Sequence, residues 1–331
     1  MKRLIFEWSL VIIFLGVLGY VMRLEPIEQQ LGKTVVIATD LPEPLARTLL
    51  KDYQGSYELI VLPVYLEEQW PSLLQARKAD LFFGSQDMLL WAARRQYLQP
   101  LKEEFLSQAD PDGKDGLGRW VGLWADPWVV AYNPERMMTK IGEKKFSIGE
   151  KDFFSYRWIF PDLGNLNGDM RNFQLYEFLT THYGEEDFYK QMNDLRPSVQ
   201  SYVENTNYGV RMVLLGQADL ALAHYSDCFF YQKEKMPLRW FSLEMNPAMI
   251  YGAGIAHETK QWDEANKILQ YWQNRPETWE EKNKIPWVRL QLNGPKYTFE
   301  MSGLEDKENQ RFFDKWLAEF RFGGIQKGII K

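Results

Sequence analysis

The chain has 331 residues, which suggests two domains or one large two-lobed unit. Its composition, 45% hydrophobic and 25% charged, is that of a globular protein and excludes wholesale disorder. The net charge of −6 argues against a nucleic-acid partner, because polyanions are bound by basic surfaces. A single cysteine excludes an intramolecular disulfide, and the common nucleotide-binding and hydrolase motifs are absent, so we expect no cofactor.

An apolar segment, Leu4–Met22, follows two basic residues at the N-terminus. As a helix it would rise about 28 Å, close to the thickness of the hydrocarbon core of a bilayer. A cleavable signal peptide is the alternative, but no A-x-A site follows, and Tyr20 stands where a lipoprotein would need a cysteine. We therefore expect an uncleaved single-pass anchor in residues 1–23 and a linker in 24–33. The basic flank predicts that the rest of the chain is extracytoplasmic.

Strand-like and helix-like segments alternate after the linker. Continuous apolar runs predict strands, one-sided apolar spacing predicts helices, and their alternation is typical of a doubly wound α/β fold. The expected strands are Thr34–Thr39, Tyr57–Val64, Asp80–Gly84, Trp128–Tyr132, Arg157–Phe160, Asp219–His224 and Met249–Ala256. The expected helices are Leu41–Tyr53, Glu67–Arg77, Gln86–Arg95, Phe173–Tyr183, Tyr208–Leu215, Asp227–Lys235, Trp262–Gln273 and Lys307–Phe320.

Two segments, 79–87 and 218–227, have a similar pattern. Each begins with Ala-Asp-Leu, continues as a short apolar strand, and runs through a polar turn into a helix. This repeat indicates two lobes of like topology. Ligands of open α/β sheets collect beyond the carboxyl ends of the strands, so we expect Ser85 and Tyr225 to face each other across a cleft.

The order of these segments resembles the type II periplasmic-binding-protein fold, and in particular the solute-binding proteins of ABC transporters in the iron, polyamine and phosphonate-like branch. The resemblance covers about residues 34–320. It rests on ADLFFGS at 79–85, DG at 112–113 with RWVGL at 119–123, AYNP at 131–134, IFPD at 159–162, LGQADLAL at 215–222 and YGAGIA at 251–256. It implies a receptor, not an enzyme, that closes on a solute and passes it to an ABC permease.

The resemblance also implies a division into lobes. The chain would cross between them twice, near Trp124–Trp128 and near Glu244–Met249. Residues 34–124 and 249–331 would then form lobe 1, and residues 125–248 would form lobe 2. Two strands would make the hinge, which closes because both lobes gain contacts only when a ligand bridges them.

The candidate site residues fall at predicted strand ends and turns. They are Thr39, Asp40, Ser85, Asp126, Asp162, Asn167, Tyr225 and Tyr251. For Asp40, Ser85 and Asp162, capping of the next helix or turn is the alternative role. Because carboxylates dominate and basic side chains are scarce, we expect a cationic or metal-containing solute.

Iron-binding members of the family carry two adjacent tyrosines after the strand that corresponds to Asp219–His224. Here only Tyr225 matches, so Tyr225 is a metal ligand only if the solute is ferric iron. Two other functions stay open. A membrane-anchored ligand sensor would need a second protein for signalling, and an anchored carbohydrate-active hydrolase would need a carboxylate pair, but no pair stands out.

Overall fold

The computed structural model describes residues 34–64, 79–141, 155–163, 170–243, 247–276 and 278–290. The expected anchor and linker, the expected helices at 67–77 and 307–320, and Asn167 lie outside the described residues. Within the ranges just given, no helix is long and apolar enough to cross a membrane.

The strands of the described residues join in one mixed sheet, in the order β2-β1-β3-β9-β4-β7-β5-β6, with β8 and β10 also paired to β4. The strands are β1 (Thr34–Thr39), β2 (Glu58–Pro63), β3 (Leu81–Ser85), β4 (Trp120–Tyr132), β5 (Trp158–Pro161), β6 (Val199–Val203), β7 (Leu220–His224), β8 (Arg239–Ser242), β9 (Ala248–Ile255) and β10 (Val288–Arg289).

The sheet has two parallel ends and an antiparallel centre. At one end β1 pairs in parallel with β2 and β3, and at the other β5 pairs in parallel with β6 and β7. Between them, β4 runs antiparallel to both β9 and β7. The predicted parallel pairing therefore holds for the two ends, although their outer strands β2 and β6 are only partly buried, whereas the long central strands are antiparallel to their neighbours.

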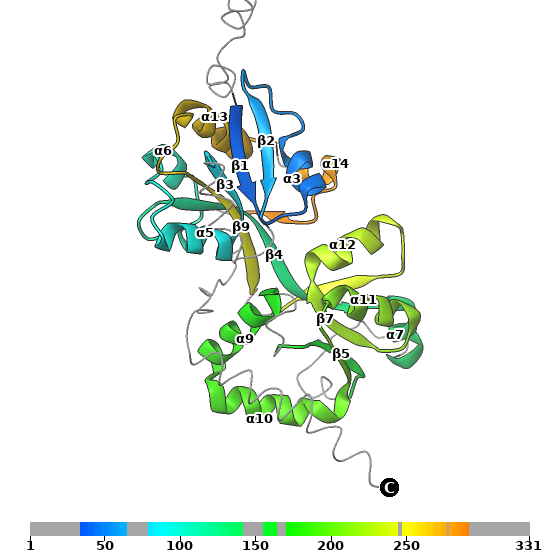
Figure 1. Cartoon of the computed structure of the whole chain (residues 1–331). Coiled ribbons are helices and arrows are strands. Elements are labelled where there is room, and N and C mark those ends of the chain that lie inside the picture. Colours follow the sequence, from blue (N-terminus) through cyan, green and yellow to red (C-terminus); the bar gives the residue numbers. More distant parts are fainter. Residues whose placement is uncertain are drawn as a thin grey trace, which may run out of the picture.

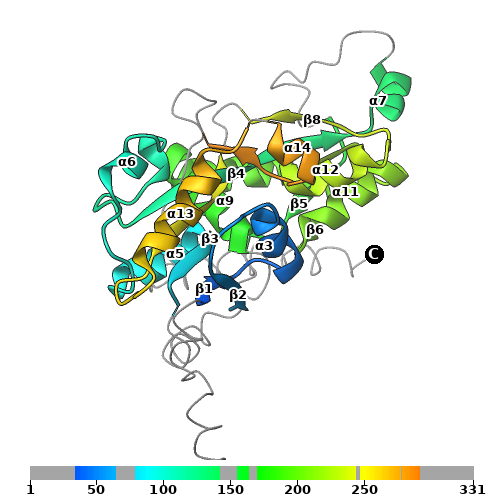
Figure 2. The same ribbon diagram turned by 90° about the horizontal axis from the view of Figure 1, so that it is seen from above.

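Helices cover the two ends of the sheet separately, as Figures 1 and 2 show. We call the elements around β1–β3 the first lobe and those around β5–β7 the second lobe. The helices of the first lobe are α3 (Glu43–Leu50), α5 (Gln86–Arg94), α6 (Glu103–Leu106), α13 (Trp262–Gln273) and α14 (Trp279–Asn283). Those of the second lobe are α7 (Pro134–Ile141), α9 (Met170–Tyr183), α10 (Glu185–Leu195), α11 (Thr206–Leu215) and α12 (Tyr225–Lys233).

The strand β4 contributes to the core of both lobes. Trp124 is fully buried beside Phe83 and Trp272, and these two rings stack with their centroids 4.4 Å apart. Four residues later, Trp128 is buried in a different cluster together with Trp158. Burying a Trp or Phe side chain stabilises a fold by several kcal/mol, about 3 or more for such large groups. Trp124 and Trp128 therefore pack the cores of the two lobes, and neither is exposed to a ligand.

Candidate functional site

The Ala-Asp-Leu repeat has the same hydrogen bonds in both lobes. In the first lobe, Asp80 N donates to Val36 O at 2.8 Å, and Val36 N donates to Asp80 Oδ2 at 2.9 Å. In the second, Asp219 N donates to Arg157 O at 2.9 Å, and Arg157 N donates to Asp219 Oδ2 at 3.0 Å. Each aspartate thus fastens its own strand to the adjacent parallel strand, β1 or β5. The repeat is a structural device that sets β3 and β7 in register.

Asp40 and Ser85 form a paired contact at the end of β3. Asp40 Oδ1 accepts from Ser85 N at 2.9 Å, and Asp40 Oδ2 accepts from Ser85 Oγ. Ser85 is also the N-cap of α5 and accepts from Met88 N at 3.4 Å. A Cβ added to Gly84 would lie 2.1 Å from Asp40 Oδ1, so only glycine lets the carboxylate approach this closely. Burial raises the pKa of Asp40, and the hydrogen bonds from Ser85 oppose that shift.

Two further predicted residues lie near this pair. Tyr251 is opposite Ser85 in the β3–β9 register, and its ring stacks on Trp287 with the centroids 3.9 Å apart. Thr39 is fully buried, and its Oγ1 accepts from Leu41 N at 3.1 Å. The structure therefore brings Thr39, Asp40, Ser85 and Tyr251 together in the first lobe.

Asp126 and Ser226 repeat the paired contact in the second lobe. Asp126 Oδ1 accepts from Ser226 N at 2.9 Å, and Asp126 Oδ2 accepts from Ser226 Oγ at 2.6 Å. Asp126 has no solvent exposure, so the contact fixes the first turn of α12 to β4. Sequence analysis missed Ser226. Its signal was available, because a serine follows the repeated strand in both copies, at Ser85 and at Ser226.

Tyr225 is the first residue of α12 and is half-buried. Its ring packs edge-on against Trp240, with the centroids 5.4 Å apart. Burial raises the pKa of Tyr225, and the carboxylates of Asp126 and Glu281 raise it further. Glu281 is on α14 of the first lobe, so charges from both lobes act on this phenol.

Two polar contacts among the described residues join the lobes directly. Lys233 Nζ on α12 lies 3.7 Å from Glu281 Oε1 on α14, and these two helices are neighbours in Figure 1. Gln174 Nε2 on α9 donates to Asp87 Oδ2 on α5 at 3.2 Å. Both contacts are polar and involve flexible side chains. Opening or closing of the lobes would therefore exchange them for water at little cost.

Asp162 forms hydrogen bonds with β6 and α9, and the Asp40–Ser85 and Asp126–Ser226 pairs take no part in them. It follows β5 and is buried, with 3% of its surface exposed. Its N donates to Val203 O at 2.8 Å, and its O accepts from Asn172 Nδ2 at 3.4 Å. Asp162 thus connects the end of β5 to β6 and α9, while the predicted neighbour Asn167 lies outside the described residues.

The described residues contain no cluster of three or more His, Cys, Asp and Glu side chains that could hold a metal ion. The predicted site residues instead form two groups, one around Asp40 and Ser85 and one around Asp126 and Tyr225. In each group the carboxylate orients the start of the helix that follows the repeated strand.

No family model and no curated protein matches the sequence. Solved structures match most of it. Iron-bound HitA from Pseudomonas aeruginosa is 18% identical, over 87% of this chain and 98% of that chain, with a TM-score of 0.61. Ferric iron-binding protein A of Mannheimia haemolytica, in an open conformation, is 15% identical, over 88% and 99%, with a TM-score of 0.64. The periplasmic binding protein AfuA from Actinobacillus pleuropneumoniae, with fructose-6-phosphate bound, is 14% identical, over 87% and 99%, with a TM-score of 0.57.

The chain has the two-lobed fold of the periplasmic solute-binding proteins. The fold class that the sequence resemblance implied is therefore confirmed for the described residues. The expected N-terminal transmembrane helix stays a prediction. Of these three structures, one is bound to iron, one is a ferric iron-binding protein in an open conformation, and one holds fructose-6-phosphate.

Proposed function

We propose that the chain is an extracytoplasmic receptor that binds a small solute and delivers it to an ABC permease. The observation that carries the proposal is the fold, in which two α/β lobes are joined through β4 and β9, as in binding proteins for iron and a sugar phosphate. Residues 34–124 and 249–331 form one lobe in this proposal, and residues 125–248 form the other. Residues 4–22 would hold the receptor at the outer face of the membrane.

The proposed solute is cationic or contains a metal ion. Besides burial, the carboxylates of Asp126 and Glu281 raise the pKa of Tyr225, so both contribute negative potential at the phenol. A bound cation would offset this negative potential. Ferric iron would bind the phenolate of Tyr225 and release its proton, whereas an organic ammonium would use the ring or the hydroxyl group.

The proposed site residues divide by role. Tyr225 is the proposed direct contact, with Ser85 and Tyr251 in the first lobe. Asp40 and Asp126 already accept two hydrogen bonds each from serine. They would therefore act on a cation through their charge and by orienting the starts of α5 and α12. The roles proposed for Thr39, Asp162 and Asn167 stay predictions.

Titration of the purified full-length protein with ferric citrate and with spermidine tests the proposal. If iron binds, a visible charge-transfer band should appear and Tyr225→Phe should abolish it. If spermidine binds, no band should appear, and Tyr225→Phe should weaken binding about fivefold, the loss of one neutral hydrogen bond. The matched control is Tyr208→Phe, since Tyr208 on α11 is 60% exposed. Equal binding to wild type and Tyr225→Ala would contradict the site assignment.

A further inference from the structure

A hollow of about 500 Å³ lies on the first lobe, where α13, α14 and the segment after α3 meet. The Asp126–Tyr225 group takes no part in it. Its walls include Asp52, Lys267, Tyr271, Asn274, Arg275 and Trp279. Cavities of this size are typical of small-molecule sites. The most unusual member of the wall is a buried arginine.

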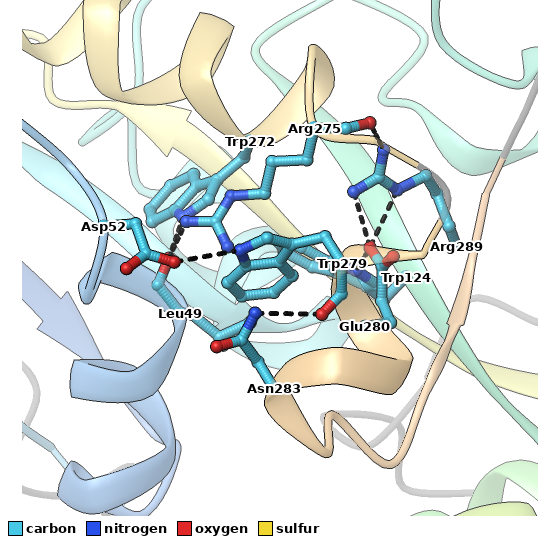
Figure 3. A network of polar contacts seen from close by, with 9 residues as sticks. All are labelled: Leu49, Asp52, Trp124, Trp272, Arg275, Trp279, Glu280, Asn283 and Arg289. Atoms are coloured by element: carbon cyan, nitrogen blue, oxygen red, sulfur yellow. Dashed lines mark hydrogen bonds and ion pairs between the residues drawn. The ribbon is translucent and has the colours of Figure 1, made fainter.

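Arg275 is held between two aromatic rings. Its Cζ lies 3.9 Å from the centroid of Tyr271 and 3.3 Å from that of Trp279, and only 7% of the residue is exposed. Its Nη2 donates to Leu49 O, as Figure 3 shows. The rings and this hydrogen bond fix the plane of the guanidinium group. An arginine fixed in this way can donate a charge-assisted hydrogen bond to an oxyanion.

Two donor atoms of Arg275 lack an acceptor among the described residues. Nε and Nη1 are buried without a hydrogen-bond partner, and within the described ranges no carboxylate forms an ion pair with Arg275. Glu280, an acidic residue of the same network, pairs with Arg289 at 2.6 Å and accepts from Trp124 Nε1 at 2.9 Å. Burial lowers the pKa of Arg275 to about 10. A buried charge with two unused donors is costly unless a ligand accepts from them.

We propose that this hollow is a second ligand site, which binds a small organic oxyanion whose charged end accepts a hydrogen bond from an unpaired N–H group of Arg275. Asn274 and Lys267 add donors at the wall. Asp52 adds a negative charge, and its Oδ2 accepts from Trp279 Nε1 at 3.4 Å. That charge favours a monoanion such as a carboxylate over the dianion of a phosphate ester.

Calorimetric titration of the purified full-length protein with acetate and with inorganic phosphate tests this proposal. A Kd of about 1 mM or tighter is expected for at least one probe, and a 10 mM concentration would then fill about 90% of the sites. Acetate binding alone assigns a carboxylate site, and phosphate binding alone assigns a phosphate-ester site. Saturable binding of neither probe would overturn the proposal.

Three variants locate the binding. Arg275→Gln should weaken it at least tenfold, because it removes charge-assisted hydrogen bonds. Arg239→Gln is the matched control on β8, where the side chain is exposed, and it should leave binding unchanged. Asp52→Asn changes an exposed carboxylate and should tighten binding about threefold, so it keeps the test decisive if Arg275→Gln does not fold. Unchanged affinity in folded Arg275→Gln, or weaker binding in Asp52→Asn, would contradict the proposal.

Discussion

The two lobes use the same aspartate–serine contact, but they take the aspartate from different places. In the first lobe Asp40 comes from the turn after β1, so its contact with Ser85 stays within one lobe. In the second lobe Asp126 comes from β4, which also pairs with β9. The start of α12, which carries Tyr225, is therefore fixed to a strand that both lobes share. A hinge motion of β4 would therefore reach Tyr225 through the contact between Asp126 and Ser226.

The largest expected difference between the lobes is in stability. Asp126→Ala should lower the free energy of unfolding by about 3 kcal/mol, because it removes a carboxylate without solvent exposure that accepts two hydrogen bonds from Ser226. Asp40→Ala should cost about 1–2 kcal/mol, since Asp40 is partly exposed and water replaces its hydrogen bonds. Chemical denaturation of the two variants checks this. Equal losses would show that the two contacts are equivalent.

A smaller difference is expected in the response to salt. Asp80→Ala and Asp219→Ala each remove the acceptor of a backbone N–H and should each cost about 2 kcal/mol. The second oxygen of Asp80 accepts from the hydroxyl group of Thr259, whereas Asp219 pairs with Arg157, whose side chain is 42% exposed. The cost of Asp219→Ala should therefore fall by a few tenths of a kcal/mol in about 1 M salt. The cost of Asp80→Ala should not change with salt. If it falls as much as the cost of Asp219→Ala, the proposed difference between the two aspartates is wrong.

The smallest effect is a pH dependence confined to the first lobe. Burial raises the pKa of Asp40, so the folded state binds its proton more tightly than the unfolded state. The resulting stability is complete below the ordinary pKa of a carboxyl group and is lost as the pH rises through the raised value. Asp40→Asn removes this titration and keeps a partner for Ser85. Its stability relative to wild type should therefore grow between about pH 4 and pH 7 in thermal denaturation. A difference that is flat or shrinks over this range would contradict the assignment.

Much of the fold could be predicted because apolar runs and amphipathic spacing mark buried elements. The predicted strand Thr34–Thr39 and helix Trp262–Gln273 have the observed bounds. Only the second part of β4, Trp128–Tyr132, was predicted, because Asp126 and Pro127 interrupt the apolar run. In the structure, Pro127 lies opposite Ala248 of β9, and Asp126 accepts a hydrogen bond from Ser226. Both contacts are made with residues far away in the sequence, so the apolar pattern alone could not predict that the strand continues.

The candidate site was less accessible to sequence analysis. Asp40, Ser85 and Tyr225 were identified because each follows a predicted strand, and ligands of open α/β sheets bind beyond the carboxyl ends of the strands. That two of the aspartates bind serines could not be predicted, because the partners are 45 and 100 residues apart. Arg275 gave no signal either. Its aromatic neighbours and its unused donors depend on how α13 and α14 pack.

Native mass spectrometry of the gently purified full-length protein tests the central claim most directly. The account predicts one small cationic or metal-containing solute per chain, present in wild type and in Arg275→Gln, and lost or much reduced in Tyr225→Ala. Arg275→Gln is included as a control because it should lose any anion bound in the hollow of the first lobe. A solute that this variant retains is therefore not bound at that second site. A free anion such as phosphate retained in Arg275→Gln, or a solute retained equally in Tyr225→Ala, would contradict the account.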